Sequence, residues 1–208
     1  MKELALKSTI LLFFLFQPGL SGQNWDINLL KHINLDRNKS LDGTFSFVTN
    51  SAGPVSFGVP VIICGAGFLK HDSLTVRNSL NIGSALVVTV IISTIAKYTI
   101  NRTRPFVKYP YIEKEAAGGS PSFPSGHTSE AFAFATSVSL TYPKWYVIAP
   151  SLLWAGAVGY SRMDLGVHYP SDVLAGAIIG AGCSWITFKV NQRLSNKAYR
   201  NKRSASIN

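Results

Sequence analysis

The chain consists of long apolar stretches separated by short polar connections. Five stretches contain no charged residue at all, at residues 43–69, 78–96, 131–143, 145–161 and 173–188. None shows the strict alternation of polar and apolar positions that marks a half-buried strand, and each is long enough for a helix. The pattern therefore predicts five helices and an all-α fold.

The lengths of these stretches bear on whether they lie in a membrane or in a soluble core. A bilayer requires about 20 apolar residues per helix, which only the first two stretches comfortably provide, so the last three could be core helices of a soluble bundle. Gly176 and Gly180 form a small-residue face suited to close packing of membrane helices. Aromatic residues of the kind found at membrane interfaces lie near the ends of the stretches, at Tyr142, Trp145, Tyr146, Tyr160, Tyr169 and Trp185. These features favour a polytopic membrane helix bundle with about five transmembrane helices.

Composition supports the same choice. Charged residues make up 14% of the 208 residues, against about 25% in an ordinary soluble domain, and 47% are hydrophobic. The length allows one domain, which we place at residues 23–190. The net charge of +10 could indicate a nucleic acid partner, but six of the twenty basic residues fall in the last twenty positions. Such a cluster is typical of a tail at an anionic membrane surface, so we predict a basic cytoplasmic tail at residues 191–208 and no nucleic acid binding.

The N-terminal residues 1–22 carry two lysines, then an apolar run, then small residues. This order is typical of a signal peptide cleaved after Gly22, and an uncleaved, short membrane anchor is the alternative. In both cases the chain that follows starts outside the cytoplasm. Residues 25–35 alternate apolar and polar positions in a partly helical pattern. That segment fits either an amphipathic helix at the outer interface or an ordinary packing helix.

Counting helices from an outer start gives a topology that can be tested against charge. The first helix runs inward and the second outward, so Lys70 and Arg77 between them fall on the cytoplasmic side. Lys144, between the third and fourth helices, falls on the same side, and the fifth helix ends inside at the basic tail. Every inner connection then satisfies the positive-inside rule.

The outer connection at residues 101–123 breaks this rule because it contains several cations. Binding a phosphate would account for Arg104, and Glu113 with Glu115 would partly balance the rest, which are Arg102, Lys108 and Lys114. The exceptions to the charge rule therefore cluster where phosphate chemistry is predicted.

Three short motifs carry that chemistry. The first is Lys97 and, after six intervening residues, Arg104-Pro105; the second is Pro124-Ser125-Gly126-His127. The third is Ser161-Arg162, followed after five intervening residues by His168 and after three more by Asp172. Together they resemble the motifs of the type 2 phosphatidic acid phosphatase superfamily, which also includes bacterial class A acid phosphatases and vanadium haloperoxidases. The resemblance covers roughly residues 43–189, and no motif position departs from it.

The residue types in the motifs suit binding of a phosphate. Lys97, Arg104 and Arg162 supply positive charge, and the guanidinium groups match phosphate oxygens two at a time. Ser125 and Gly126 stand at an expected helix start, where unpaired N–H groups bind anions. Each residue alone would be interpreted as a helix cap or a solvated charge, but the joint pattern makes these five the predicted phosphate-binding residues.

The predicted catalytic residues are His168, His127 and Asp172. Pro170 favours a helix start, so Asp172 lies one turn from His168 and its carboxylate can accept a hydrogen bond from one ring nitrogen. The other nitrogen is then the nucleophile that forms a phosphohistidine, while His127 protonates the leaving alcohol and later activates water. The resemblance implies the same roles for these positions. The predicted topology places all the site residues at outer helix ends.

We expect no metal and no cofactor, because the predicted outer face offers no carboxylate or histidine cluster at ligand spacing. The expected function is hydrolysis of a membrane lipid phosphate monoester or pyrophosphate at the outer face of the bacterial inner membrane. The resemblance suggests isoprenoid pyrophosphates, phosphatidylglycerophosphate, phosphatidic acid or lipid A phosphates, and residues 106–123 are the candidate headgroup selector. The alternatives are a soluble exported acid phosphatase, a vanadium haloperoxidase, or a non-catalytic lipid-binding or transport protein.

Overall fold

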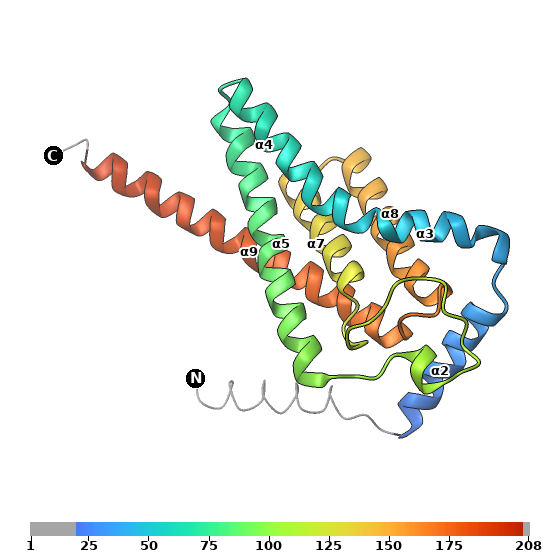
Figure 1. The fold of residues 1–208 in the computed structure, drawn as a ribbon. Helices are drawn as coiled ribbons and strands as arrows, with labels where there is room; N and C mark the ends of the chain where they lie inside the picture. Colours follow the sequence, from blue (N-terminus) through green and yellow to red (C-terminus); the bar gives the residue numbers. More distant parts are fainter. Residues whose placement is uncertain (1–19, 206–208) are drawn as a thin grey trace, which may run out of the picture.

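Figure 1 shows the computed structural model of the protein, which describes residues 20–205. Within these residues every regular element is helical, which confirms the all-α prediction. The predicted signal peptide or anchor at residues 1–22 lies outside the described residues, except for its last three positions.

Each of the five uncharged stretches forms a helix. The first is interrupted by a π-helical segment and comprises α3 (Asp42–Asn50), η2 (Pro54–Gly58) and α4 (Val59–Leu69). The other four form α5 (Ser73–Ile100), α7 (Gly126–Thr141), α8 (Trp145–Asp164) and α9 (Pro170–Ala205). The last of these continues well beyond the predicted end at residue 188, so the backbone shows no break between the bundle and the basic tail.

The remaining elements are short and lie near one end of the bundle: α2 (Leu20–Leu35), η1 (Lys39–Leu41) and α6 (Pro105–Lys108). Ile27 and Leu30 of α2 are buried in a cluster with Ile112 and Tyr169. Part of the apolar side of α2 therefore packs against the bundle, and its position at the outer interface stays a prediction.

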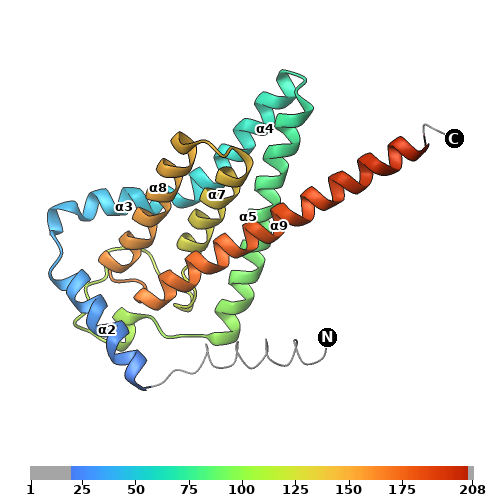
Figure 2. The ribbon, with the colours of Figure 1, turned by 180° about the vertical axis from the view of Figure 1, so that it is seen from behind.

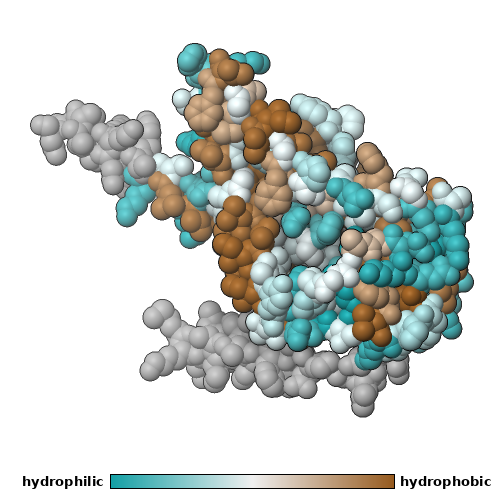
Figure 3. Space-filling view, viewed as in Figure 1, coloured by the Kyte–Doolittle hydropathy of each residue, from teal (hydrophilic) through white to brown (hydrophobic). Residues whose placement is uncertain are grey.

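Three helical segments are long and apolar enough to cross a membrane, namely Lys39–Leu69, Ser73–Lys108 and Pro170–Lys197. Figure 3 shows hydrophobic side chains along α4 and α5 and hydrophilic ones over the end where α2 lies. The protein is thus a multi-pass membrane protein, and α7 and α8 pack beside the spanning helices (Figures 1 and 2).

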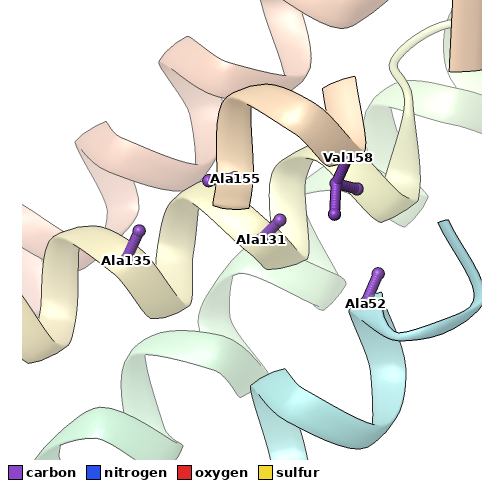
Figure 4. Packing of buried hydrophobic residues seen from close by; sticks show 5 residues of the cluster. All are labelled: Ala52, Ala131, Ala135, Ala155 and Val158. Carbon is purple, nitrogen blue, oxygen red and sulfur yellow. The ribbon is translucent and has the colours of Figure 1, made fainter. Parts of the chain in front are cut away.

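Small side chains bring α7, α8 and the chain after α3 into close contact. Figure 4 shows the cluster, in which all members are completely buried: Ala52, Ala131, Ala135, Ala155 and Val158. Alanines at such an interface let helix backbones approach closely, as is common between membrane helices.

Glycines bring α9 still closer to α7. A Cβ at Gly176 would lie 2.7 Å from the carbonyl oxygen of Ser125, and one at Gly180 would lie 2.9 Å from the backbone nitrogen of Ala133. The prediction that these two glycines form a close-packing face is confirmed. The contact fixes the start of α9 against the start of α7.

Candidate active site

The helix ends that carry the motif residues meet at one end of the bundle, the lower end in Figure 1. Lys97 lies in the last turn of α5 and Arg162 in the last turn of α8. His127 lies in the first turn of α7 and Asp172 in the first turn of α9. The structure therefore gathers residues from four helices at a single site, as the topology predicted.

Three cations and a histidine form the centre of this site. Lys97, Arg104 and Arg162 lie close enough for their charges to act on one another and on the ring of His127. Such a concentration of positive charge is unfavourable in a partly buried place unless an anion binds there. A bound phosphate would offset this charge.

The ring of His168 lies between one of these cations and a carboxylate. Its Nε2 atom is 3.3 Å from Nη1 of Arg104, and its Nδ1 atom is 3.5 Å from Oδ2 of Asp172. The second distance is longer than an ordinary hydrogen bond, and Nδ1 has no hydrogen-bond partner within the part of the chain that the structure describes. His168 therefore faces Asp172 with one nitrogen and the cation cluster with the other, as predicted, although the hydrogen bond to Asp172 is not closed.

Burial controls the protonation of His168, which is only 1% exposed. Burial lowers the pKa of this imidazole to about 3, and the nearby Arg104 and Arg162 act in the same direction while Asp172 opposes them. A neutral imidazole retains the lone pair that a nucleophile needs.

Backbone carbonyls in the connections before α7 and after α8 hold Arg104 in place. Arg104 donates from Nε to the Ser120 carbonyl at 2.7 Å and from Nη1 to the Val167 carbonyl at 2.8 Å. Its guanidinium also lies against Gly118, where a Cβ would come within 2.7 Å of Nη1. Gly118 is therefore a packing requirement, and not only the flexible position that the sequence indicates.

The other two cations are held in the same way. Lys97 donates to the carbonyls of Pro121 and Pro124 at 2.8 and 2.9 Å. Arg162 donates to Thr49 Oγ1 at 2.8 Å and to the Ala117 carbonyl at 3.1 Å, while its buried Nε has no partner among the described residues. Residues 117–124 thus contact all three cations.

The start of α7 differs in detail from the expectation. Ser125 occupies the N-cap position, but its side chain does not cap the helix and instead accepts a hydrogen bond from Thr128. Its N–H donates to the carbonyl of Asp172 at 3.1 Å, so this donor is not unpaired as predicted. Ser129 makes the first bond within the helix, which leaves the N–H groups of residues 126–128 for an anion.

Gly126 itself borders open space, since a Cβ there would meet no atom within 4 Å. The surrounding protein does not require glycine at this position. A ligand that approaches the backbone closely would require it.

Sequence reasoning missed the groups that hold Asp172 from behind. Ser122 donates its hydroxyl to Oδ2, the Tyr169 N–H donates to the same oxygen at 3.0 Å, and Arg102 donates to Oδ1 at 2.6 Å. Arg102 also pairs with Asp26 of α2 at 2.6 Å. A signal for Arg102 was present in the sequence, because it is one of the cations that break the charge rule in the outer connection.

The expected balance of that outer connection by Glu113 and Glu115 was wrong. Glu113 lies 2.9 Å from Arg37 and 2.8 Å from Lys39, and Glu115 lies 3.8 Å from Arg37. These carboxylates therefore pair with cations at the start of the first spanning segment, because the fold brings Arg37 and Lys39 next to them.

For a metal, the structure offers no built site. Over the residues that it describes, no group of three or more His, Cys, Asp or Glu side chains is arranged to hold an ion. Metal independence stays a prediction.

Known proteins are similar to this chain in sequence and in fold. Residues 78–196 match the profile of the PAP2 superfamily. The chain is 31% identical over 172 residues to an undecaprenyl-diphosphatase of Sulfolobus acidocaldarius, covering 82% of this chain and 79% of the relative. A lipid A 4'-phosphatase of Bacteroides thetaiotaomicron is 34% identical over 95 residues, which are 46% of this chain and 42% of that protein. The crystal structure of LpxE from Aquifex aeolicus superimposes with a TM-score of 0.70 at 28% identity, over 79% of this chain and 95% of that one.

Proposed function

The chain belongs to the PAP2 superfamily, and on this premise we propose that it is a metal-independent phosphatase acting on a membrane lipid through a phosphohistidine intermediate. The observation that carries the proposal is the position of His168. Its Nε2 lies 3.3 Å from Arg104 and on the side of the cation cluster, while Nδ1 faces Asp172. A nucleophile thus stands where the cations would hold a phosphate.

In the first step, Nε2 of His168 attacks phosphorus, and the bond from phosphorus to the lipid oxygen breaks. Burial and the nearby cations lower the pKa of His127, and the charge of a bound phosphate opposes them, so that the protonated His127 can give its proton to that oxygen. A lipid alcohol then leaves neutral, and a lipid phosphate leaves with one additional proton. The imidazole of His168 becomes positively charged as the new bond forms, and Asp172 stabilises this charge through Nδ1.

In the second step, His127 takes a proton from water, and the water oxygen attacks phosphorus. The bond between phosphorus and Nε2 breaks, which returns His168 to its neutral state and releases inorganic phosphate. Lys97, Arg104 and Arg162 stabilise the charge on the phosphoryl oxygens through both steps, a task that fixed cations perform well in a water-poor site. No step needs a metal ion or another cofactor.

The substrate we propose is a lipid that carries a phosphate monoester or a pyrophosphate. The named activities of the two relatives support an isoprenoid diphosphate or a lipid A phosphate. Residues 106–123 are the proposed headgroup selector, because the part from residue 117 onward contacts each cation of the site. Exchange of residues 106–123 for those of a relative with another substrate tests this role, and unchanged substrate preference would refute it.

We further propose that the site faces the exterior or periplasm from the inner membrane. The support is the charge rule, which places Lys70, Arg77 and the C-terminal cations on the cytoplasmic side. The site residues lie at the opposite helix ends. A Lys39→Cys variant treated with a membrane-impermeant thiol reagent in intact cells checks this orientation, and the exposed position 39 should be labelled. Labelling only after lysis would mean that the site faces the cytoplasm.

A soluble exported acid phosphatase is not favoured, because three segments are long and apolar enough to span a membrane. A vanadium haloperoxidase has no support in this bundle beyond the shared anion site. A non-catalytic lipid-binding protein would have no need of His127, His168 and Asp172 in one site.

The decisive experiment measures phosphate release from a panel of phosphorylated lipids and a soluble ester, without added metal, by the purified protein and its His168→Ala variant. The wild type should release phosphate from at least one lipid, and the variant should not. Equal release by both proteins would refute the nucleophile, and preference for the soluble ester would refute the lipid substrate.

A further inference from the structure

Arg102 connects the first described helix to the catalytic carboxylate. Its Nη1 donates to Oδ1 of Asp172 at 2.6 Å, and its Nη2 donates to Oδ2 of Asp26 at 2.6 Å. The guanidinium carbon lies 3.9 Å from the centre of the Tyr169 ring, a distance that suits a cation–π contact. The side chain is 26% exposed, whereas both carboxylates are buried.

Asp26 also organises the start of α9. It accepts hydrogen bonds from the N–H of Ser171 at 2.9 Å and from the Ser171 hydroxyl at 2.5 Å. A residue of α2 therefore serves the first turn of α9 as a cap would, and that turn carries Asp172. Through Asp26, α2 holds both Arg102 and the segment that Arg102 contacts.

These contacts leave the carboxylate of Asp172 without rotational freedom. Arg102 binds Oδ1, while Ser122 and the Tyr169 N–H bind Oδ2. Oδ2 is the oxygen that faces Nδ1 of His168. If Arg102 were absent, Oδ1 would lose its partner and the plane of the carboxylate could turn.

We propose that Arg102, held by Asp26, is a positioning residue that aims the Asp172 carboxylate at His168. The inference rests on the proposed function, since it assigns His168 as the nucleophile. Asp26 has a second effect, because its negative charge offsets that of Arg102. The Arg102 cation can then orient Asp172 without cancelling the stabilisation that Asp172 gives to the charged ring of His168.

The test measures kcat and KM for the lipid that the wild type hydrolyses best. Partners that orient a reacting group typically contribute about 10–100-fold to activity, so Arg102→Ala should lower kcat by about that factor. KM should hardly change, because the guanidinium of Arg102 is already bound to Asp26, Ser171 and Asp172. Arg102→Lys should recover part of the loss, and Asp26→Asn should lower kcat in the same direction by a smaller factor.

Matched controls remove the same groups elsewhere. Arg77→Ala removes an arginine from the opposite end of α5, and Asp36→Asn changes an exposed carboxylate just after α2. Both should keep the kcat of the wild type.

Chemical rescue separates positioning from folding. A cavity of about 200 Å³ that opens to solvent is lined by Arg102, Thr103, Lys108, Tyr109 and Tyr169. Added guanidinium can enter there, so it should restore kcat of Arg102→Ala several-fold and leave the Arg77→Ala variant unchanged. Restoration would support the positioning role.

Three outcomes would overturn the inference. The first is a wild-type kcat in Arg102→Ala. The second is a loss in that variant which neither lysine nor guanidinium reduces, since Arg102 would then serve only the fold. The third is a rise in KM with constant kcat. A wild type that releases no phosphate from any lipid would instead refute the proposed function, and the positioning role would fall with it.

Discussion

The guanidinium of Arg104 forms a hydrogen bond with the ring of His168, at 3.3 Å between Nη1 and Nε2. Arginine can only donate, so Nε2 accepts and the ring proton of the neutral imidazole resides on Nδ1. Nδ1 in turn faces Oδ2 of Asp172. The contact thus selects the tautomer whose lone pair lies on the side of the phosphate-binding cations.

Replacing Arg104 by lysine tests this relationship. Arg104→Lys keeps the charge but loses the forked contacts to Ser120, Val167 and His168, and misplacement of a reacting group by about 1 Å can cost about 100-fold. We expect kcat/KM for the lipid substrate to fall by about that factor. Steady-state kinetics alongside Arg77→Lys, at the far end of α5, checks the effect. Equal values for Arg104→Lys and the wild type would exclude the orienting role.

His127 should matter most for substrates with a poor leaving group. A general acid typically contributes about 10²–10⁴-fold, so His127→Asn should lower the rate on an alkyl phosphate lipid by a factor in that range. An aryl phosphate, whose leaving group needs no proton, should lose much less in the phosphorylation step. Pre-steady-state kinetics of the phosphorylation step, measured for His127→Asn and the wild type with both substrates, test this difference. An equal loss with both would mean that His127 only binds the phosphate.

The buried state of His168 predicts how stability changes with pH. The pKa of His168 is lowered to about 3 in the folded protein, against about 6.5 in an unfolded chain. Between these values the unfolded state binds the additional proton, so stability falls as pH falls, by at most about 1.4 kcal/mol per pH unit. Thermal unfolding in detergent from pH 7 to 4 should show a shallower decline for His168→Gln than for the wild type.

His32→Gln, a change at an exposed histidine of α2, provides the control for that measurement and should follow the wild-type curve. If His168→Gln and the wild type declined in parallel, His168 would titrate alike in both states. The buried neutral ring would then be excluded.

Glycine at the contact of α9 with α7 should be essential for stability. A Cβ at Gly176 meets the Ser125 carbonyl, whereas one at Gly182 on the same helix meets nothing within 4 Å. Gly176→Ala should therefore destabilise the protein by about 1–3 kcal/mol, the usual cost of overpacking, and Gly182→Ala should not. Unfolding midpoints of both variants in the same detergent make the comparison, and equal midpoints would contradict the close contact.

Activity should survive removal of divalent metals. The proposed chemistry uses the charges of Lys97, Arg104 and Arg162, so treatment with EDTA should leave kcat unchanged. Loss of phosphate release in EDTA that Mg²⁺ restores would show instead that a metal takes part.

The gathering of Lys97, His127, Arg162 and Asp172 at one end of the bundle could be predicted because each lies at the end of an apolar stretch. Counting those stretches determines which ends are neighbours. Helix spacing likewise indicated that His168 and Asp172 are one turn apart. The spacing of two residues on one helix, and the alternating direction of successive helices, can both be read directly from a sequence.

The contacts of Asp26 with Arg102 could not be predicted in this way. They join residues 76 positions apart in the chain, and nothing in the spacing of either residue indicates the other. The same holds for Lys97, whose carbonyl partners Pro121 and Pro124 are backbone atoms that any residue type would provide. These pairs form only in the tertiary structure. The sequence therefore shows the charged residues but not their partners.

The bond between Asp26 and Ser171 spans 145 positions of the sequence, and this separation has a consequence for synthesis. The ribosome makes α2 well before α9, so the support behind Asp172 can assemble only after Ser171 has emerged. Fragments that have inserted α3 to α8 would hold cations but no aligned nucleophile. The proposed catalytic site would therefore be completed late, once α2 and α9 have met.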